Sequence, residues 1–169
     1  VYQRHCPGLI LHYQPIVHLE TGKIRSFEAL VRWQHPQHGL IAPGRFIPMA
    51  EETGLIVPLG EWVLRTACKQ MRIWVDQFPN KSPFTISVNL ASKQCALPDL
   101  PKLVQDILTE TNLSASYLKL ELTESAIMDN AASFINMLHR LRALGLQLSI
   151  DDFGTGYSSL SYLRRFPIN

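Results

Sequence analysis

The sequence predicts an α/β fold of the barrel type, in which parallel strands alternate with helices. Stretches typical of strands and of helices follow each other in steps of about thirty residues, the spacing of strand-helix units. Each predicted strand carries one apolar face and one polar or small face, whereas a parallel sheet buried on both faces gives continuous apolar runs. A closed barrel explains this difference, because the apolar faces meet the helices and the polar faces point into the barrel, where a site can form.

The first part of the chain indicates two strands followed by a helix. Residues 9–17 and 24–33 are typical of strands, and a turn is predicted between them at Thr21 and Gly22. A helix is predicted over 64–75, because its apolar residues fall on one face: Leu64, Ala67, Cys68, Met71, Trp74 and Val75.

The second part of the chain repeats a strand and a helix. Three further strands with alternating apolar and polar residues are predicted at 84–90, 117–123 and 146–151. Helices are predicted to follow them at about 100–111, 130–144 and 158–165.

The composition excludes several classes of protein. The chain has 16 Lys and Arg against 14 Asp and Glu, and a net charge of +2 gives no electrostatic reason to bind a nucleic-acid polymer. Hydrophobic residues make up 46% and charged residues 18%, so the chain can bury a large core and is not a disordered tail. No stretch reaches the roughly 18 consecutive apolar residues of a membrane span. We therefore expect a soluble chain, and, since it does not begin with Met, a piece of a longer protein.

Cysteine and histidine do not indicate a metal centre. Cys6, Cys68 and Cys95 are far apart and form no C-x-x-C pair, which speaks against a disulfide framework and a thiolate zinc site. This cysteine usage favours a reducing cytoplasm. His35 and His38 have the spacing of metal ligands, but the proline and glycine beside them predict a loop with solvated histidines.

Acidic and amide residues recur near the carboxyl ends of the strands, on the polar face: Glu28, Asn89, Glu121 and Asp151. Carboxylates held together repel one another unless a cation neutralises them, and oxygen ligands favour Mg²⁺ or Mn²⁺ over zinc. Asp152 would add a ligand for a second ion, as in two-metal sites for in-line displacement at phosphorus. Taken singly, the Asp pair could be a helix cap or a loop charge, and Glu124 could cap the following helix.

Six motifs occur in order along the chain: Tyr13-Gln14-Pro15-Ile16-Val17, Ser26-Phe27-Glu28-Ala29-Leu30-Val31-Arg32-Trp33, Phe46-Ile47-Pro48-Met49-Ala50-Glu51-Glu52-Thr53-Gly54, Ser87-Val88-Asn89-Leu90, Glu121-Leu122-Thr123-Glu124-Ser125 and Asp151-Asp152-Phe153-Gly154-Thr155-Gly156-Tyr157-Ser158-Ser159-Leu160. Together they resemble the EAL-domain phosphodiesterases, which hydrolyse the bacterial second messenger cyclic di-GMP. The signature tripeptide of that family matches Glu28-Ala29-Leu30. The resemblance covers almost the whole chain.

The resemblance implies a modified TIM barrel whose first strand is antiparallel to the others. It also implies that Glu28, Asn89, Glu121 and Asp151 hold one Mg²⁺ or Mn²⁺ ion, while Asp151 and Asp152 hold a second. A metal-bridging hydroxide would then attack one phosphorus in line and open cyclic di-GMP to linear pGpG. The expected catalytic residues are therefore Glu28, Asp151 and Asp152.

Three residues are expected to bind substrate. Arg32, four residues beyond Glu28 on the same strand face, is similar to the family arginine that contacts a substrate phosphate, and its planar fork suits phosphate. Gln14 occupies a ligand-contact position of the family, and Leu30 completes the signature tripeptide. Without the resemblance, Arg32 would be a surface charge and Gln14 an amide at the end of a strand.

A regulatory loop is expected after the last predicted strand. Its residues, Asp152, Phe153, Gly154, Thr155 and Gly156, resemble the family loop that couples dimerisation to metal binding. The glutamate that steadies this loop in the family matches Glu124. We therefore expect a homodimer formed through this loop, although Gly-Thr-Gly is also found in ordinary tight turns.

The length of the chain limits what it can contain. A barrel of eight strand-helix units takes about 250 residues, so residues 1–169 are expected to hold the N-terminal two thirds of one EAL domain, with five strands. In the family, the last three strands supply a catalytic lysine and a further ligand glutamate. We therefore expect the 169-residue fragment to be inactive by itself.

The whole protein is expected to be a cytoplasmic bacterial signalling protein, with or without a membrane tether. By resemblance it would carry sensor or GGDEF-like domains in addition to the phosphodiesterase domain. The alternative is a non-catalytic receptor that binds cyclic di-GMP and signals by conformational change.

Overall fold

The computed structural model describes residues 8–79, 84–123 and 131–151. Its helices and strands are, in chain order, β1 (Leu9–Val17), β2 (Ile24–His35), β3 (Gly39–Ile41), α1 (Pro43–Thr53), α2 (Ile56–Gln77), β4 (Thr85–Leu90), α3 (Ser92–Cys95), α4 (Leu100–Thr111), the 3₁₀ helix η2 (Ala115–Tyr117), β5 (Leu118–Thr123), α5 (Ala131–Ala143) and β6 (Gln147–Asp151). The helix predicted at 158–165 lies outside the described residues.

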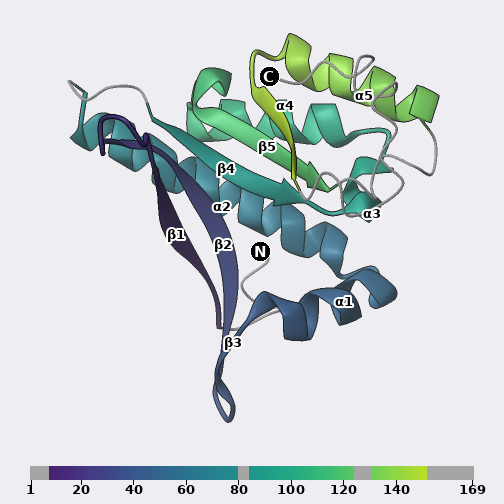
Figure 1. The fold of residues 1–169 in the computed structure, drawn as a ribbon. Helices are drawn as coiled ribbons and strands as arrows, with labels where there is room; N and C mark the ends of the chain where they lie inside the picture. The colour runs from purple at the N-terminus through teal and green to yellow at the C-terminus, as the bar shows by residue number, and fades with distance from the viewer. Residues whose placement is uncertain (1–7, 80–83, 124–130, 152–169) are drawn as a thin grey trace.

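The strands form one sheet in the order β1-β2-β4-β5-β6, and the short β3 pairs with β2. β1 is antiparallel to β2, while the pairs β2/β4, β4/β5 and β5/β6 are parallel. The prediction of an antiparallel first strand is therefore confirmed. Figure 1 shows α2, α4 and α5 along one side of this sheet. Crossover helices that all lie on one side are typical of a barrel wall rather than of a doubly wound sheet.

The face of the sheet that meets the helices is apolar and closed to solvent. Alternate residues of β4, β5 and β6 are at most 1% exposed: Ile86, Val88, Leu90, Leu118, Leu120, Leu122 and Leu148. They form one cluster with Cys68 and Met71 of α2 and with Leu138 and Leu141 of α5. Because side chains alternate across a strand, the residues between them point to the other face. The predicted division into an apolar and a polar face is confirmed.

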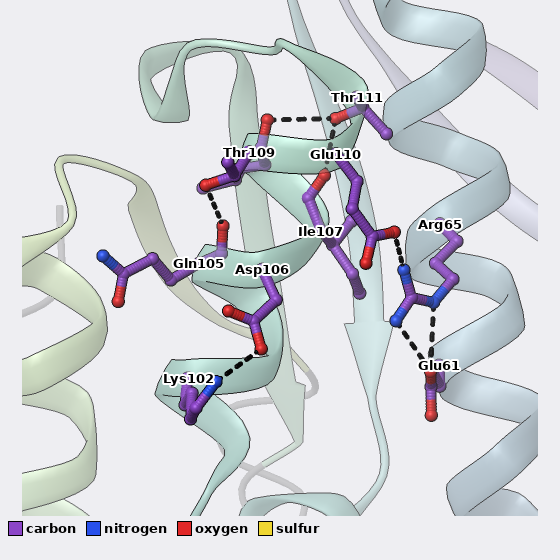
Figure 2. A network of polar contacts seen from close by, with 10 residues as sticks. Glu61, Arg65, Lys102, Gln105, Asp106, Ile107, Thr109, Glu110 and Thr111 are labelled. Atoms are coloured by element: carbon purple, nitrogen blue, oxygen red, sulfur yellow. Dashed lines mark hydrogen bonds and ion pairs between the residues drawn. The ribbon is translucent and has the colours of Figure 1, made fainter.

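An arginine on the outer side of the fold connects α2 to α4. The Nε of Arg65 donates to Oε1 of Glu61 at 3.0 Å, one turn earlier in α2, and its Nη1 contacts Glu110 of α4. Figure 2 shows Arg65 between these two carboxylates, while the Lys102–Asp106 pair, 2.8 Å apart, stays within α4. Partly exposed ion pairs contribute about 0–1 kcal/mol each. The network therefore connects α2 to α4 but contributes little to the free energy of unfolding.

The structure differs from the sequence prediction between β2 and β4. The sequence prediction omits β3, α1, α3 and the first eight residues of α2, from Ile56 to Val63. Pro48 lies inside α1, and Pro58 and Gly60 lie near the start of α2, so all three are typical of a break in a helix. Pro58 is nevertheless tolerated, because the first four backbone N–H groups of a helix have no partner within it.

Two cysteines are buried in the described part of the chain, and the two histidines with metal-like spacing lie in a hairpin. Cys68 and Cys95 are free and buried, and burial raises the pKa of each thiol to about 12. Such thiols are poor nucleophiles and poor metal ligands at neutral pH. His35 is the last residue of β2 and pairs with Gly39 of β3, so the predicted loop is in fact a hairpin, with His38 in its turn. In the part of the chain that the structure describes, no helix is long and apolar enough to cross a membrane.

Gly60 allows α2 to pack closely on the segment after β4. A Cβ atom at Gly60 would lie 2.0 Å from Nε2 of Gln94. Gln94 is only 3% exposed, and its Oε1 accepts a hydrogen bond from the backbone N–H of Ala91 at 3.2 Å. A side chain at position 60 must therefore displace a buried, hydrogen-bonded amide.

We predict that Gly60→Ala lowers the free energy of unfolding by about 1–3 kcal/mol, through overpacking and loss of this hydrogen bond. Urea denaturation of both proteins measures the change. Gly44→Ala is the matched control, because a Cβ atom there meets nothing within 4 Å. Equal midpoints for Gly60→Ala and the wild type would contradict the assignment.

Candidate functional site

The inward face of the sheet carries polar residues at successive levels along the strands. One level joins five strands in register: Gln14, Glu28, Ser87, Lys119 and Gln147. Two residues further toward the carboxyl ends, the next level consists of Asn89, Glu121 and Ser149. Asp151 lies two residues beyond Ser149 and pairs with Thr123. From β2 to β6, the predicted ligands thus lie at register levels progressively closer to the carboxyl ends, as expected when the strands of a barrel are tilted.

Glu28 and Asn89 meet across β2 and β4. The Nδ2 of Asn89 donates a hydrogen bond to Oε1 of Glu28 at 2.8 Å. Glu28 is half-buried and Asn89 is exposed, so solvent reaches this pair. The prediction that these two strands bring their polar residues together is therefore correct for this pair. A cation between them would require Asn89 to present its Oδ1 instead.

Glu121 is buried and forms an ion pair with a lysine that the sequence analysis did not select. It is 8% exposed, and its Oε1 lies 2.8 Å from Nζ of Lys119. Lys119 precedes Glu121 by two residues on β5, so the alternation of the strand puts both on the inward face. The alternation of side chains along β5 was therefore enough to identify Lys119 from the sequence.

A cavity of about 510 Å³ lies beside the middle of β2 and the carboxyl end of β4. Leu30, Asn89 and Asp151 line it, together with Glu51 of α1 and Gln94 of α3. Its volume is within the range of small-molecule sites, about 300–1,000 Å³. The structure therefore brings three of the predicted site residues to one hollow, and it adds Glu51 and Gln94, which the sequence analysis did not select.

The two predicted substrate residues near this cavity have different surroundings. Arg32 is half-buried, and its Nη1 donates to the backbone oxygen of Val31 at 2.8 Å. Gln14 is exposed and is the register partner of Glu28 on β1. Neither residue lines the cavity. The Val31 carbonyl takes one of the five N–H donors of Arg32, and a phosphate could bind the others.

The predicted metal ligands are only partly assembled in the described residues. Within 8–79, 84–123 and 131–151, no three Asp, Glu, His or Cys side chains are grouped closely enough to hold a metal ion. Asp151 is exposed at the end of β6. The remaining predicted site residues lie outside the described residues: Glu124, Asp152, Phe153, Gly154, Thr155 and Gly156.

The sheet order, the antiparallel first strand and the polar carboxyl ends define a TIM-like barrel with its candidate site at the carboxyl edge of the strands. Residues 3–169 match the family model described as EAL domain, and the chain belongs to the EAL-domain family. The resemblance and fold class predicted from the motifs are thereby confirmed.

Curated relatives are much longer than this chain. It is 52% identical over 159 residues to the bifunctional diguanylate cyclase/cyclic di-GMP phosphodiesterase MucR of Pseudomonas aeruginosa, covering 94% of this chain and 23% of MucR. It is 47% identical over 161 residues to the cyclic di-GMP phosphodiesterase NbdA of the same organism, covering 95% of this chain and 20% of NbdA. The chain thus spans about a fifth of the length of these relatives.

Solved EAL structures match the fold closely. The MucR phosphodiesterase in complex with c-di-GMP has a TM-score of 0.91 and 50% identity, over 99% of this chain and 66% of that chain. The EAL enzyme Bd1971, bound to cAMP and cyclic di-GMP, also has a TM-score of 0.91, with 38% identity over 99% of this chain and 46% of that chain.

Proposed function

We propose that this chain forms part of a cyclic di-GMP phosphodiesterase domain that opens the cyclic dinucleotide to linear pGpG. The observation that carries the proposal is the contact of Glu28, in the Glu-Ala-Leu tripeptide, with Asn89, which lines a cavity together with Asp151. The similarity to MucR and NbdA supports the same substrate. Hydrolysis of cyclic di-GMP by the full-length protein, followed by chromatography of pGpG, tests it.

The donor set suits a hard divalent cation. Carboxylate and amide oxygens from Glu28, Asn89, Glu121 and Asp151 are ligands that Mg²⁺ and Mn²⁺ accept, and none of them is a thiolate or imidazole. In our proposal these four hold one ion, and Asp151 with Asp152 holds a second. Bound ions of this kind activate water and neutralise charge at phosphorus. We also place Glu28, Asp151 and Asp152 in the catalytic role.

The chain's own residues would orient the substrate. The Arg32 guanidinium would bind a phosphate oxygen through donors of its planar fork that Val31 does not occupy. Leu30 would pack against the nucleotide in the cavity that it lines, and Gln14 would contact the substrate from β1. The position of these groups around one edge of the sheet would hold a phosphodiester near the ligand oxygens.

Regulation and context are further parts of the proposal. We assign Asp152, Phe153, Gly154, Thr155 and Gly156, together with Glu124, to a loop that links metal binding to homodimer formation. Because the chain covers only 23% of MucR and 20% of NbdA, we propose that other signalling domains accompany it in a cytoplasmic protein. Binding of cyclic di-GMP by the full-length protein without any turnover would favour a receptor instead.

We predict that Glu28→Gln and Asn89→Ala in the full-length protein each lower kcat by about a hundredfold or more, with little change in melting temperature. Each variant removes an oxygen ligand from a partly exposed position, so packing is hardly disturbed. Chromatography of pGpG measures kcat. Glu20→Gln, an exposed residue in the β1–β2 turn at the opposite end of the strands, is the control. Wild-type turnover in both site variants would refute the ligand assignment.

We predict that Mg²⁺ or Mn²⁺ supports hydrolysis and that Ca²⁺ competes without supporting it. Ca²⁺ takes more ligands at longer distances, about 2.3–2.6 Å, and would misplace the attacking oxygen. Calorimetric titration and an activity assay with each ion in the full-length protein measure both effects. Turnover with Ca²⁺ equal to that with Mg²⁺ would contradict the proposed geometry.

We predict that residues 1–169 by themselves hydrolyse cyclic di-GMP about a hundredfold more slowly than the full-length protein. The chain spans 66% of the solved MucR phosphodiesterase chain, and β6 lies at the edge of the described sheet. Ligand positions that are loose by about 1 Å can cost a hundredfold in rate. Incubation with Mn²⁺ and chromatography of pGpG compare the two proteins. Rates within about tenfold of each other would show that this part of the fold suffices.

A further inference from the structure

Lys119 contributes a positive charge to the inward face, among the candidate ligands. It shares a register level with Glu28 and Ser87, and its Nζ lies 2.8 Å from Oε1 of Glu121. The Lys119 side chain is 28% exposed and that of Glu121 is 10% exposed. This ion pair is therefore more shielded from water than the Lys102–Asp106 pair on the surface of α4, whose side chains are 67% and 49% exposed.

The inward carboxylates have partners of different charge. Glu28 is bonded to the neutral amide of Asn89, whereas buried Glu121 is bonded to an ammonium group. A buried carboxylate without a cation destabilises a fold, because little water reaches it. In the metal-free protein, Lys119 compensates the charge of Glu121.

We propose that Lys119 is the internal counter-cation of the metal site, and that it lowers the affinity of this site for divalent ions. This inference rests on the proposed metal site. A divalent ion that takes Glu121 as a ligand must share its carboxylate with Lys119 or displace the ammonium. The positive charge also repels the arriving cation through a partly shielded medium, where charges interact more strongly than in water. Lys119 is a positioning residue in this account, since it acts through Glu121.

The fold offers the ammonium a second partner. The Oγ of Ser87 is fully buried and has no hydrogen-bond partner in the described part of the chain. Ser87 is the register partner of Lys119 on β4, so its hydroxyl lies on the neighbouring strand at the same level. An ammonium displaced from Glu121 could donate to this hydroxyl. The lysine therefore has one partner without a metal ion and another partner when Glu121 becomes a ligand.

The test is a calorimetric titration of the full-length protein with Mn²⁺, for the wild type and for Lys119→Met, which keeps the apolar stem and removes the charge. We expect Lys119→Met to bind Mn²⁺ about tenfold more tightly. We also expect it to melt at a lower temperature without metal, and to gain more from added Mn²⁺ than the wild type does. Lys119→Arg should behave like the wild type. Lys102→Met, which removes an exposed cation from α4, should leave Mn²⁺ affinity unchanged.

The direction of the change separates the explanations. If Lys119 only packs against Glu121 or orients it, removing Lys119 leaves the affinity for Mn²⁺ unchanged or lowers it. Unchanged or weaker Mn²⁺ binding by Lys119→Met would therefore overturn the proposed role as counter-cation. If Lys119→Met does not fold, Lys119→Gln keeps a hydrogen-bond donor beside Glu121 without the charge, and the same comparison applies. Absence of Mn²⁺ binding by the wild type would overturn the proposed metal site and this inference with it.

Discussion

The two-residue period of the parallel strands decides which side chains pack against the helices and which face the inside of the barrel. One face of β4, β5 and β6 must be apolar, because α2, α4 and α5 bury it. The other face is then free to carry polar side chains, and it collects them where the carboxyl ends of the strands meet. The helices stabilise the fold on the outside, while the inward residues, from Glu28 to Asp151, are available for chemistry.

The inward face concentrates negative charge, and its electrostatics explain much of its local structure. Glu28 is held by an amide donor and Glu121 by an ammonium donor, so each carboxylate is satisfied without a metal ion. Such partners keep the metal-free fold stable, yet each of them must reorient before both carboxylates can coordinate a common cation. Interactions that stabilise the metal-free site therefore lower its affinity for cations, and the ion pair of Lys119 with Glu121 has both effects.

The sequence was sufficient to predict the strands and their apolar and polar faces, because alternation is a local property. It was not sufficient for α1, whose interior Pro48 obscures the helical pattern. The stagger between Glu28 and Asn89 follows from long-range register, which no local pattern contains. Lys119 could have been found, since it shares the face of Glu121, but a search for acidic groups passed over it.

Anomalous diffraction from crystals of the full-length protein grown with Mn²⁺ would locate the metal ion without any assay of turnover. The account predicts a peak at coordination distance, about 2.0–2.6 Å, from oxygens of Glu28, Asn89, Glu121 and Asp151. It also predicts that Asn89 has turned its Oδ1 toward the peak and no longer donates to Glu28. A peak away from these strand ends, or no peak and an intact bond between Asn89 and Glu28, would contradict it.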